Sequence, residues 1–212
     1  MARTKSRFVC QECGYVASSW LGRCPECGGW NTLVEEAEVT AKASKSYLPA
    51  NNEKLRPRTI ASVAQTKVER LATGIREFDR VLGGGIVLGG VVLLSGEPGV
   101  GKSTMLLQLC GAISNQHTVL YITGEESVRQ VKLRAARLKV PQDNIYLAAE
   151  NDVDEICGLI EKEKPELVVI DSIQTMRCMD ISSSAGTVSQ VKESAARLLA
   201  VAKKQEIPMF IV

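Results

Sequence analysis

A glycine-rich stretch near the middle of the chain has the residue types and the spacing that bind phosphate groups. It reads Gly96-Glu97-Pro98-Gly99-Val100-Gly101-Lys102-Ser103 and matches the pattern G-x-x-x-x-G-K-[ST]. Glycines let such a loop wrap around phosphates with its backbone N–H groups pointing inward, and a helix N-terminus adds a favourable partial charge. A chance match is disfavoured, because an apolar strand is predicted before the loop and an apolar helix after it.

This pattern predicts a site for ATP formed by the loop and the next residue, Thr104. Lys102 is expected to reach the β- and γ-phosphates, and Ser103 is expected to ligate Mg²⁺. A second metal-side carboxylate is needed, and Asp171 provides one at the end of the apolar run Leu167-Val168-Val169-Ile170. Active sites of open α/β sheets lie at such strand ends, although an aspartate there can also simply cap the next segment.

Hydrolysis also requires a group that orients or deprotonates water. Glu125 and Glu126 follow the predicted strand Val119–Thr123. Two adjacent glutamates can be no more than favourable charges at a helix N-terminus. The interpretation favoured here assigns Glu125 as the catalytic carboxylate and Glu126 as the helix charge.

Four cysteines form the second pattern, Cys10-x2-Cys13-x10-Cys24-x2-Cys27. Four thiolates at this spacing suit a tetrahedral structural Zn²⁺, and binding worth about 10–16 kcal/mol is enough to fold a block that lacks a core of its own. Redox pairs and an iron–sulfur cluster are the alternatives. Trp20 and Trp30 flank the second cysteine pair, and we expect them to form a small core rather than stack on bases. His117 is expected to be a surface residue, not a ligand.

The elements that must position these groups alternate between strands and helices. Strands are predicted at 90–95, 119–123, 145–148, 167–171 and 209–212, and helices at 102–114, 127–138, 152–163 and 188–204. Nearly continuous apolar strands in this order predict a parallel sheet covered on both faces, an α/β fold. The helix at 127–138 has an apolar stripe of Val128, Val131, Ala135 and Leu138. Its basic residues are expected to form a solvated face: Arg129, Lys132, Arg134, Arg137 and Lys139.

Composition divides the chain into a zinc ribbon at 1–35, a basic flexible linker at 36–70 and a globular core at 71–212. Residues 40–70 contain seven Lys or Arg and two Glu. The net charge of +2 excludes a globally basic nucleic-acid binder, and no apolar run is long enough to span a membrane. Seven cysteines, an odd number, without a secretory signal favour a reducing compartment, and we expect the protein in the cytoplasm.

Several stretches together resemble the bacterial RadA family, also called Sms. They are residues 8–15, 20–25 and 30–33 in the ribbon, and 73–85, 95–104, 121–127, 167–174 and 183–191 in the core. The resemblance implies a RecA-like P-loop ATPase core that follows a zinc ribbon. It also implies DNA-stimulated ATP hydrolysis in recombinational DNA repair, on branched intermediates. By the same resemblance Glu125 matches the family's catalytic glutamate, and residues 179–187 hold the position of its first DNA-facing loop.

The resemblance further implies a homo-oligomeric ring on DNA and a recombinase of the RecA type as partner. The family continues beyond Val212 with a second DNA-facing loop and a further domain, and the chain ends inside an apolar strand, so we expect a fragment. In RecA-like folds that strand, 209–212 here, lies between the Asp171 strand and the phosphate-loop strand. Two rival functions remain: another RecA-like ATPase, which the ribbon disfavours, and a non-enzymatic zinc-ribbon adaptor whose phosphate loop is a nucleotide switch.

Overall fold

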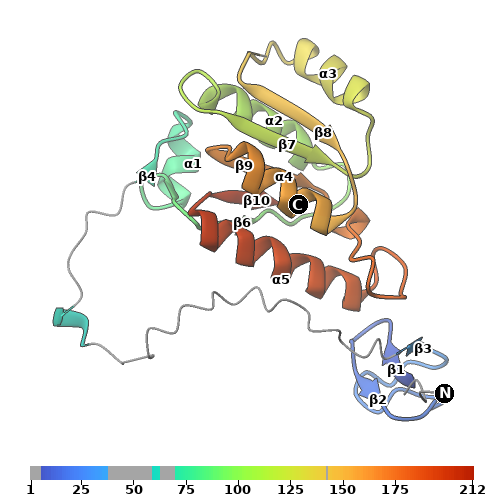
Figure 1. Ribbon diagram of the computed structural model, residues 1–212. Coiled ribbons are helices and arrows are strands. Elements are labelled where there is room, and N and C mark those ends of the chain that lie inside the picture. Colours follow the sequence, from blue (N-terminus) through green and yellow to red (C-terminus); the bar gives the residue numbers. More distant parts are fainter. Residues whose placement is uncertain (1–5, 38–58, 63–69, 142) are drawn as a thin grey trace.

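The computed structural model describes residues 6–37, 59–62, 70–141 and 143–212 (Figure 1). A small antiparallel sheet holds the cysteine pairs, in the order β2 (Val16–Ala17), β1 (Ser6–Cys10) and β3 (Leu33–Ala37). A larger α/β unit contains the phosphate-loop sequence. Most of the predicted linker at 36–70 lies outside the described residues; the exceptions are the end of β3, Thr59 with the short 3₁₀ helix Ile60–Ser62, and Arg70.

Five parallel strands form the central sheet of the α/β unit, in the order β6-β10-β9-β7-β8. They are β6 (Val91–Leu93), β10 (Met209–Ile211), β9 (Leu167–Asp171), β7 (Val119–Thr123) and β8 (Ile145–Ala149). The predicted insertion of the last strand is confirmed, because β10 pairs with β6 on one side and with β9 on the other. The strands end together: Thr123 lies opposite Asp171, and Leu93 opposite Ile211.

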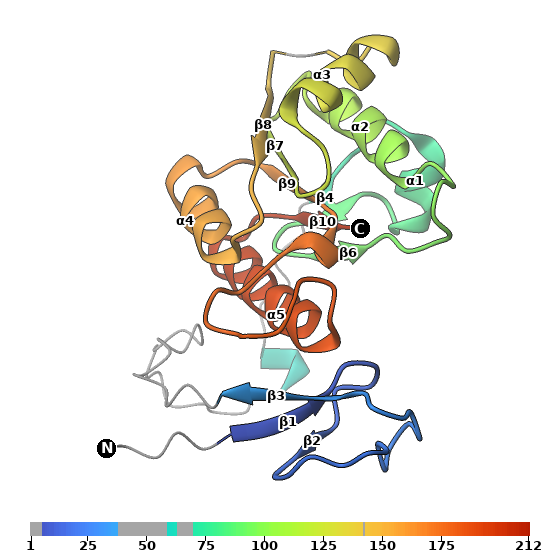
Figure 2. The same cartoon turned by 90° about the vertical axis from the view of Figure 1, so that its right-hand side faces the viewer.

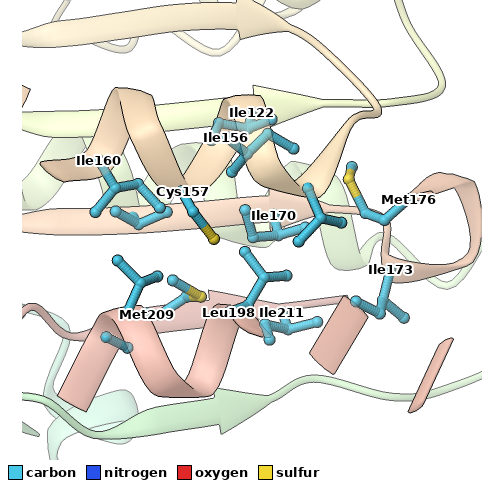
Figure 3. Packing of buried hydrophobic residues seen from close by; sticks show 14 of the residues in the cluster. Ile122, Ile156, Cys157, Ile160, Ile170, Ile173, Met176, Leu198, Met209 and Ile211 are labelled. Atoms are coloured by element: carbon cyan, nitrogen blue, oxygen red, sulfur yellow. The ribbon is translucent and has the colours of Figure 1, made fainter. Parts of the chain in front are cut away.

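Helices cover both faces of this sheet, which confirms the α/β prediction. Figure 2 shows α2 (Lys102–Ile113) and α3 (Val128–Arg137) on one side and α4 (Val153–Glu163) and α5 (Val188–Gln205) on the other. Successive strand residues point to opposite faces. Ile122, Ile170 and Ile211 therefore pack on α4 and α5, as Figure 3 shows, whereas Tyr121, Val169 and Phe210 pack in the cluster of α2 and α3.

Three short elements before the sheet have no counterpart among the predicted ones. They are β4 (Arg70–Leu71), α1 (Arg76–Val81) and β5 (Ile86–Val87), which pairs antiparallel with β4. Phe78 of α1 contacts Phe210 of β10 edge to face, with ring centroids 5.8 Å apart. Elements this short present too few residues for a period of two or 3.6 to be recognised, so only the tertiary packing reveals them.

Helix α3 confirms most of its predicted apolar stripe, and one position is wrong. Val131 and Ala135 are buried and Leu138 is half-buried, whereas Val128 is exposed. Val128 is the first residue of the helix, directly after the N-cap Ser127, whose side chain forms a capping box with Gln130. None of the described helices combines the length and the apolar character that crossing a bilayer requires.

Candidate functional site

The phosphate-loop sequence connects β6 to α2 at the carboxyl edge of the sheet. Gly101 is the N-cap of α2 and has a left-handed backbone with φ of 98°, a conformation that favours glycine. The Lys102 ammonium bends back over the loop and donates to the carbonyl oxygens of Gly96 at 2.8 Å and Glu97 at 3.0 Å. The loop is thus an exposed turn with a cation held over its own carbonyl groups.

Asp171 lies at the end of β9, where two hydroxyl groups hold both oxygens of its carboxylate. Ser103 Oγ donates to Oδ1 at 3.1 Å, and the Tyr121 hydroxyl donates to Oδ2. Burial and the neighbouring Asp171 carboxylate raise the pKa of Tyr121 above its ordinary value, so the phenol keeps its proton and acts as the donor. The serine and the aspartate come from segments 68 residues apart, and the sheet places them side by side.

The two adjacent glutamates after β7 point to different partners. Glu125 accepts a hydrogen bond from Ser172 and lines the same cleft as the phosphate loop. Glu126 pairs with Arg134 of α3 instead. Gly124 lies between the strand β7 and these two glutamates and packs closely on Thr175. A Cβ added at Gly124 would overlap Thr175 Oγ1 and lie 2.9 Å from Thr175 Cβ.

The predicted solvated basic face of α3 is wrong at Arg134. Its side chain is only 19% exposed, and no hydrogen-bond acceptor within the described part of the chain reaches its buried Nη1. Arg134 and Arg137 both line the cleft, whereas Arg129 and Lys132 are exposed away from it. A sequence pattern assigns a residue to a face of the helix, but it does not show that Glu126, which precedes the helix, pairs with Arg134 on the polar face.

A single cleft of about 830 Å³ brings most of the predicted nucleotide residues together. Of the predicted residues, Glu97 and Val100 are exposed and do not line it. Ser172, Gln174 and Arg134 line it in addition. The predicted residues in its wall are Gly96, Pro98, Gly99, Gly101, Lys102, Ser103, Thr104, Glu125 and Asp171. The cleft therefore combines backbone donors, one ammonium group, two carboxylates and hydroxyl oxygens.

A second cavity lies at the opposite end of the strands and contains none of the predicted site residues. It is lined by His117 and Glu166 among others. His117 Nδ1 lies 2.9 Å from the Glu166 carboxylate, which also accepts the backbone N–H of Thr118. The bond with His117 and that N–H group hold the pKa of Glu166 below its usual range. His117 is thus satisfied by a protein partner and stands apart from the cysteine cluster.

The four cysteines of the ribbon converge to a site that suits one metal ion. Their Sγ atoms all lie within 4.8 Å of one another, and no other group of three potential ligands of this kind occurs in the described residues. Each cysteine pair ends in a tight turn, in which Gly14 N donates to Cys10 O and Gly28 N to Cys24 O, both at 2.9 Å. Both glycines have left-handed φ values, 77° and 74°.

Four thiolates so close together would repel one another, so the deprotonated cluster needs a cation to balance its charge. The backbone N–H of Tyr15 acts to lower the pKa of Cys13, but burial and the surrounding thiols outweigh it and raise that pKa to about 12. For Cys10, by contrast, burial acts to raise the pKa, but the hydrogen bonds with the Thr32 hydroxyl and with backbone N–H groups outweigh it and lower the pKa to about 6. Four soft sulfur ligands in one cluster are the donor set that zinc prefers.

The prediction that Trp20 and Trp30 form the ribbon's core is wrong. Trp20 is 55% exposed and Trp30 is 71% exposed. The small core consists of Ala17 and Leu33 with Cys10 and Cys24, and Phe8, Cys13 and Tyr15 pack against it. The Arg23 guanidinium lies over the Trp30 ring, 5.7 Å from its centroid. The cysteines occupy the centre of the ribbon, and both indole rings lie outside it.

The stretch at 179–187, predicted to face DNA, forms a loop that is fixed at its base by α5. The buried Gln190 amide accepts the backbone N–H of Cys178 at 2.8 Å and donates to Ser183 O at 2.9 Å. Arg197 pairs with Asp180 of the loop, and also with Asp154 and Glu193. Met179 and residues 184–186 are exposed. The loop therefore has an ordered base and an outward-facing tip.

Comparisons with known families agree with both parts of the chain. A family described as rubredoxin metal binding domain matches residues 8–35, and one described as AAA domain matches residues 52–212. The KaiC-like protein of Pyrococcus horikoshii OT3 has a similar fold. Its crystal structure superposes with a TM-score of 0.56 over 68% of this chain and 69% of that chain, at 23% sequence identity. This likeness concerns the fold alone and confirms the RecA-like prediction.

The curated relatives carry the name DNA repair protein RadA. That of Bacillus subtilis (strain 168) is 46% identical over 215 residues, and those of Halalkalibacterium halodurans and Listeria monocytogenes are 46% identical over 214 and 212 residues. Each match covers 100% of this chain and 46–47% of the relative. The chain spans about half the length of the relatives it matches. The chain belongs to the AAA domain family, and along its whole length it is similar to the RadA proteins.

Proposed function

We propose that the cleft at the carboxyl edge of the sheet binds ATP with Mg²⁺ and hydrolyses it. The observation that carries the proposal is the convergence of Lys102, Ser103, Glu125 and Asp171, from three different strand ends, on one cleft. A bare phosphate-binding turn needs only the first two of these residues. The addition of two carboxylates supplies what metal binding and water activation require.

Each residue has a distinct role in this proposal. Lys102 exchanges its two loop carbonyls for phosphate oxygens, and the loop's backbone N–H groups surround the phosphates. The hydroxyl of Ser103 and the carboxylate of Asp171 are hard oxygen donors held next to each other, as a Mg²⁺ site requires. When bound, Mg²⁺ would neutralise charge on the phosphates. Glu125 orients the attacking water and accepts its proton, with Ser172 fixing the carboxylate.

We propose further that the whole protein is a DNA-stimulated ATPase of recombinational repair that processes branched intermediates. The names of the similar proteins support this, and so does the exposed tip of the 179–187 loop. In the proposed organisation residues 1–35 are a zinc ribbon with Zn²⁺ held by Cys10, Cys13, Cys24 and Cys27. Residues 36–70 are a basic linker and residues 71–212 an ATPase core. A ring on DNA, a RecA-type recombinase as partner and a cytoplasmic location belong to the same proposal.

The test measures ATP binding and turnover with and without single-stranded DNA, for the wild type and the Lys102→Ala variant. We expect turnover that rises with DNA, and loss of binding or turnover in the variant, because the charge facing the phosphates is removed. Nucleotide binding with no turnover under any condition would instead identify a nucleotide switch. ATP turnover that is unchanged by single-stranded DNA would indicate a RecA-like ATPase with a different function.

A further inference from the structure

The Tyr121 hydroxyl is a polar group that neither the phosphate loop nor the water-activating step uses. Tyr121 lies on β7, an interior strand between β9 and β8, and its side chain is fully buried on the α2 and α3 face of the sheet. A buried phenol needs a hydrogen-bond partner, and this one donates to Asp171 Oδ2.

The two oxygens of Asp171 have different surroundings. Oδ1 receives the hydroxyl of Ser103, a residue at the first turn of α2. Oδ2 accepts the hydroxyl of Tyr121, whose side chain lies in the buried cluster between the sheet and α2 and α3. Both donors are attached to rigid elements, so the plane of the carboxylate is fixed from two directions. Because Oδ2 already accepts the Tyr121 hydroxyl, Oδ1 is the oxygen that remains beside Ser103 in the cleft.

We propose that Tyr121 is a positioning residue for metal binding: it holds Asp171 Oδ2 so that Oδ1 and the Ser103 hydroxyl face one Mg²⁺ together. This inference rests on the proposed function of the cleft. Groups that orient a metal ligand are worth about 10–100-fold in metal affinity. The hydroxyl is expected to affect nucleotide binding only through the metal, because Tyr121 is buried and does not line the cleft.

The experiment compares Tyr121→Phe with the wild type by titrating Mg²⁺ into protein and a fluorescent ATP analogue, with binding as the readout. The variant keeps the ring and loses only the hydroxyl. The Mg²⁺ concentration for half-maximal binding is expected to rise about 10-fold. Nucleotide affinity in EDTA is expected to stay within error, whereas the melting temperature without nucleotide is expected to fall moderately, because Asp171 Oδ2 loses its buried donor. Tyr146→Phe on β8 is the matched control, because that ring is 59% exposed, and it should change nothing.

A double-mutant cycle shows whether Tyr121 acts through Asp171. In an Asp171→Asn background, Tyr121→Phe should have no further effect on the Mg²⁺ titration. An unchanged titration in Tyr121→Phe, or the same 10-fold effect in both backgrounds, would overturn the inference. A wild type whose nucleotide binding is absent or indifferent to Mg²⁺ would contradict the proposed function itself. If nucleotide binding by the wild type depends on Mg²⁺ but the Mg²⁺ titration of Tyr121→Phe is unchanged, only the role of Tyr121 is contradicted and the proposed function stands.

Discussion

At the scale of single residues, the structure separates two glutamates that are adjacent in the sequence. Glu126 is committed to Arg134, with side chains 31% and 19% exposed, while Glu125 lines the cleft and is held by Ser172. Glu126 does not line the cleft, and its carboxylate is engaged by the Arg134 guanidinium. The geometry therefore favours Glu125 as the group that activates water.

Exchange of each glutamate for glutamine tests this assignment. Glu125→Gln is nearly isosteric and should keep nucleotide affinity, while ATP turnover falls by about 100-fold or more, since general base catalysis contributes roughly 10²–10⁴. Glu126→Gln should keep most of the turnover and lower the melting temperature, because Arg134 loses its charged partner. Turnover assays and thermal melts on both variants check this. If Glu126→Gln abolished turnover and Glu125→Gln did not, the roles would be reversed.

At the scale of elements, the turn between β7 and α3 carries Glu125 into the cleft, and its path depends on close packing. Gly124 N donates to Asp171 O at 2.9 Å, and its Cα faces Thr175 of the 3₁₀ helix Ile173–Thr175. This contact ties the ends of β7 and β9 together directly under the two carboxylates. A side chain at 124 would have to push them apart.

Gly124→Ala is therefore expected to reduce turnover at least 10-fold, since displacement of a catalytic group by about 1 Å can cost 100-fold. The matched control is Gly158→Ala in α4, where an added Cβ meets nothing within 4 Å. That change should leave turnover intact and stabilise the helix by about 0.5–1 kcal/mol. Steady-state kinetics and denaturant melts compare the two. Full activity in Gly124→Ala would show that the turn tolerates the displacement.

At the scale of the whole molecule, the two folded parts depend on different sources of stability. The α/β unit buries two large apolar clusters, one on each face of its sheet. The ribbon buries few apolar side chains and leaves both tryptophans exposed. Domains of that size need a metal or disulfides to remain folded. The structure of the ribbon should therefore depend on zinc, and the core should not.

Removal of one zinc ligand, Cys24→Ser, should abolish stoichiometric zinc binding and unfold the ribbon, while the main melting transition of the core stays in place. Metal analysis and a tryptophan fluorescence melt report on the ribbon, because both tryptophans lie in it. Affinity should also fall as the pH is lowered, since zinc must displace protons from thiols and Cys13 binds its proton tightly, with a pKa raised to about 12. Retention of one zinc per chain by Cys24→Ser would disprove the four-thiolate site.

The sequence by itself determined the sheet, its helices and the identity of most groups in the cleft. Long apolar runs and 3.6-residue stripes report burial directly, and the loop at 96–103 and the cysteine pairs are local patterns whose geometry follows from adjacent residues. That is why strands such as β7 and β9 were predicted to the residue.

Only the tertiary structure decided which polar groups meet across the sheet. Tyr121 lies within an apolar strand, and nothing in the sequence indicated its hydrogen bond to Asp171, 50 residues away. Arg134 was predicted to be a solvated helix residue, but its Nη1 is buried. The tryptophans were predicted to be core residues, because hydrophobicity alone does not show that a cluster of cysteines already fills the centre of the ribbon. Hydrogen bonds and metal sites depend on distances between segments remote in sequence, and those distances exist only once the chain has folded.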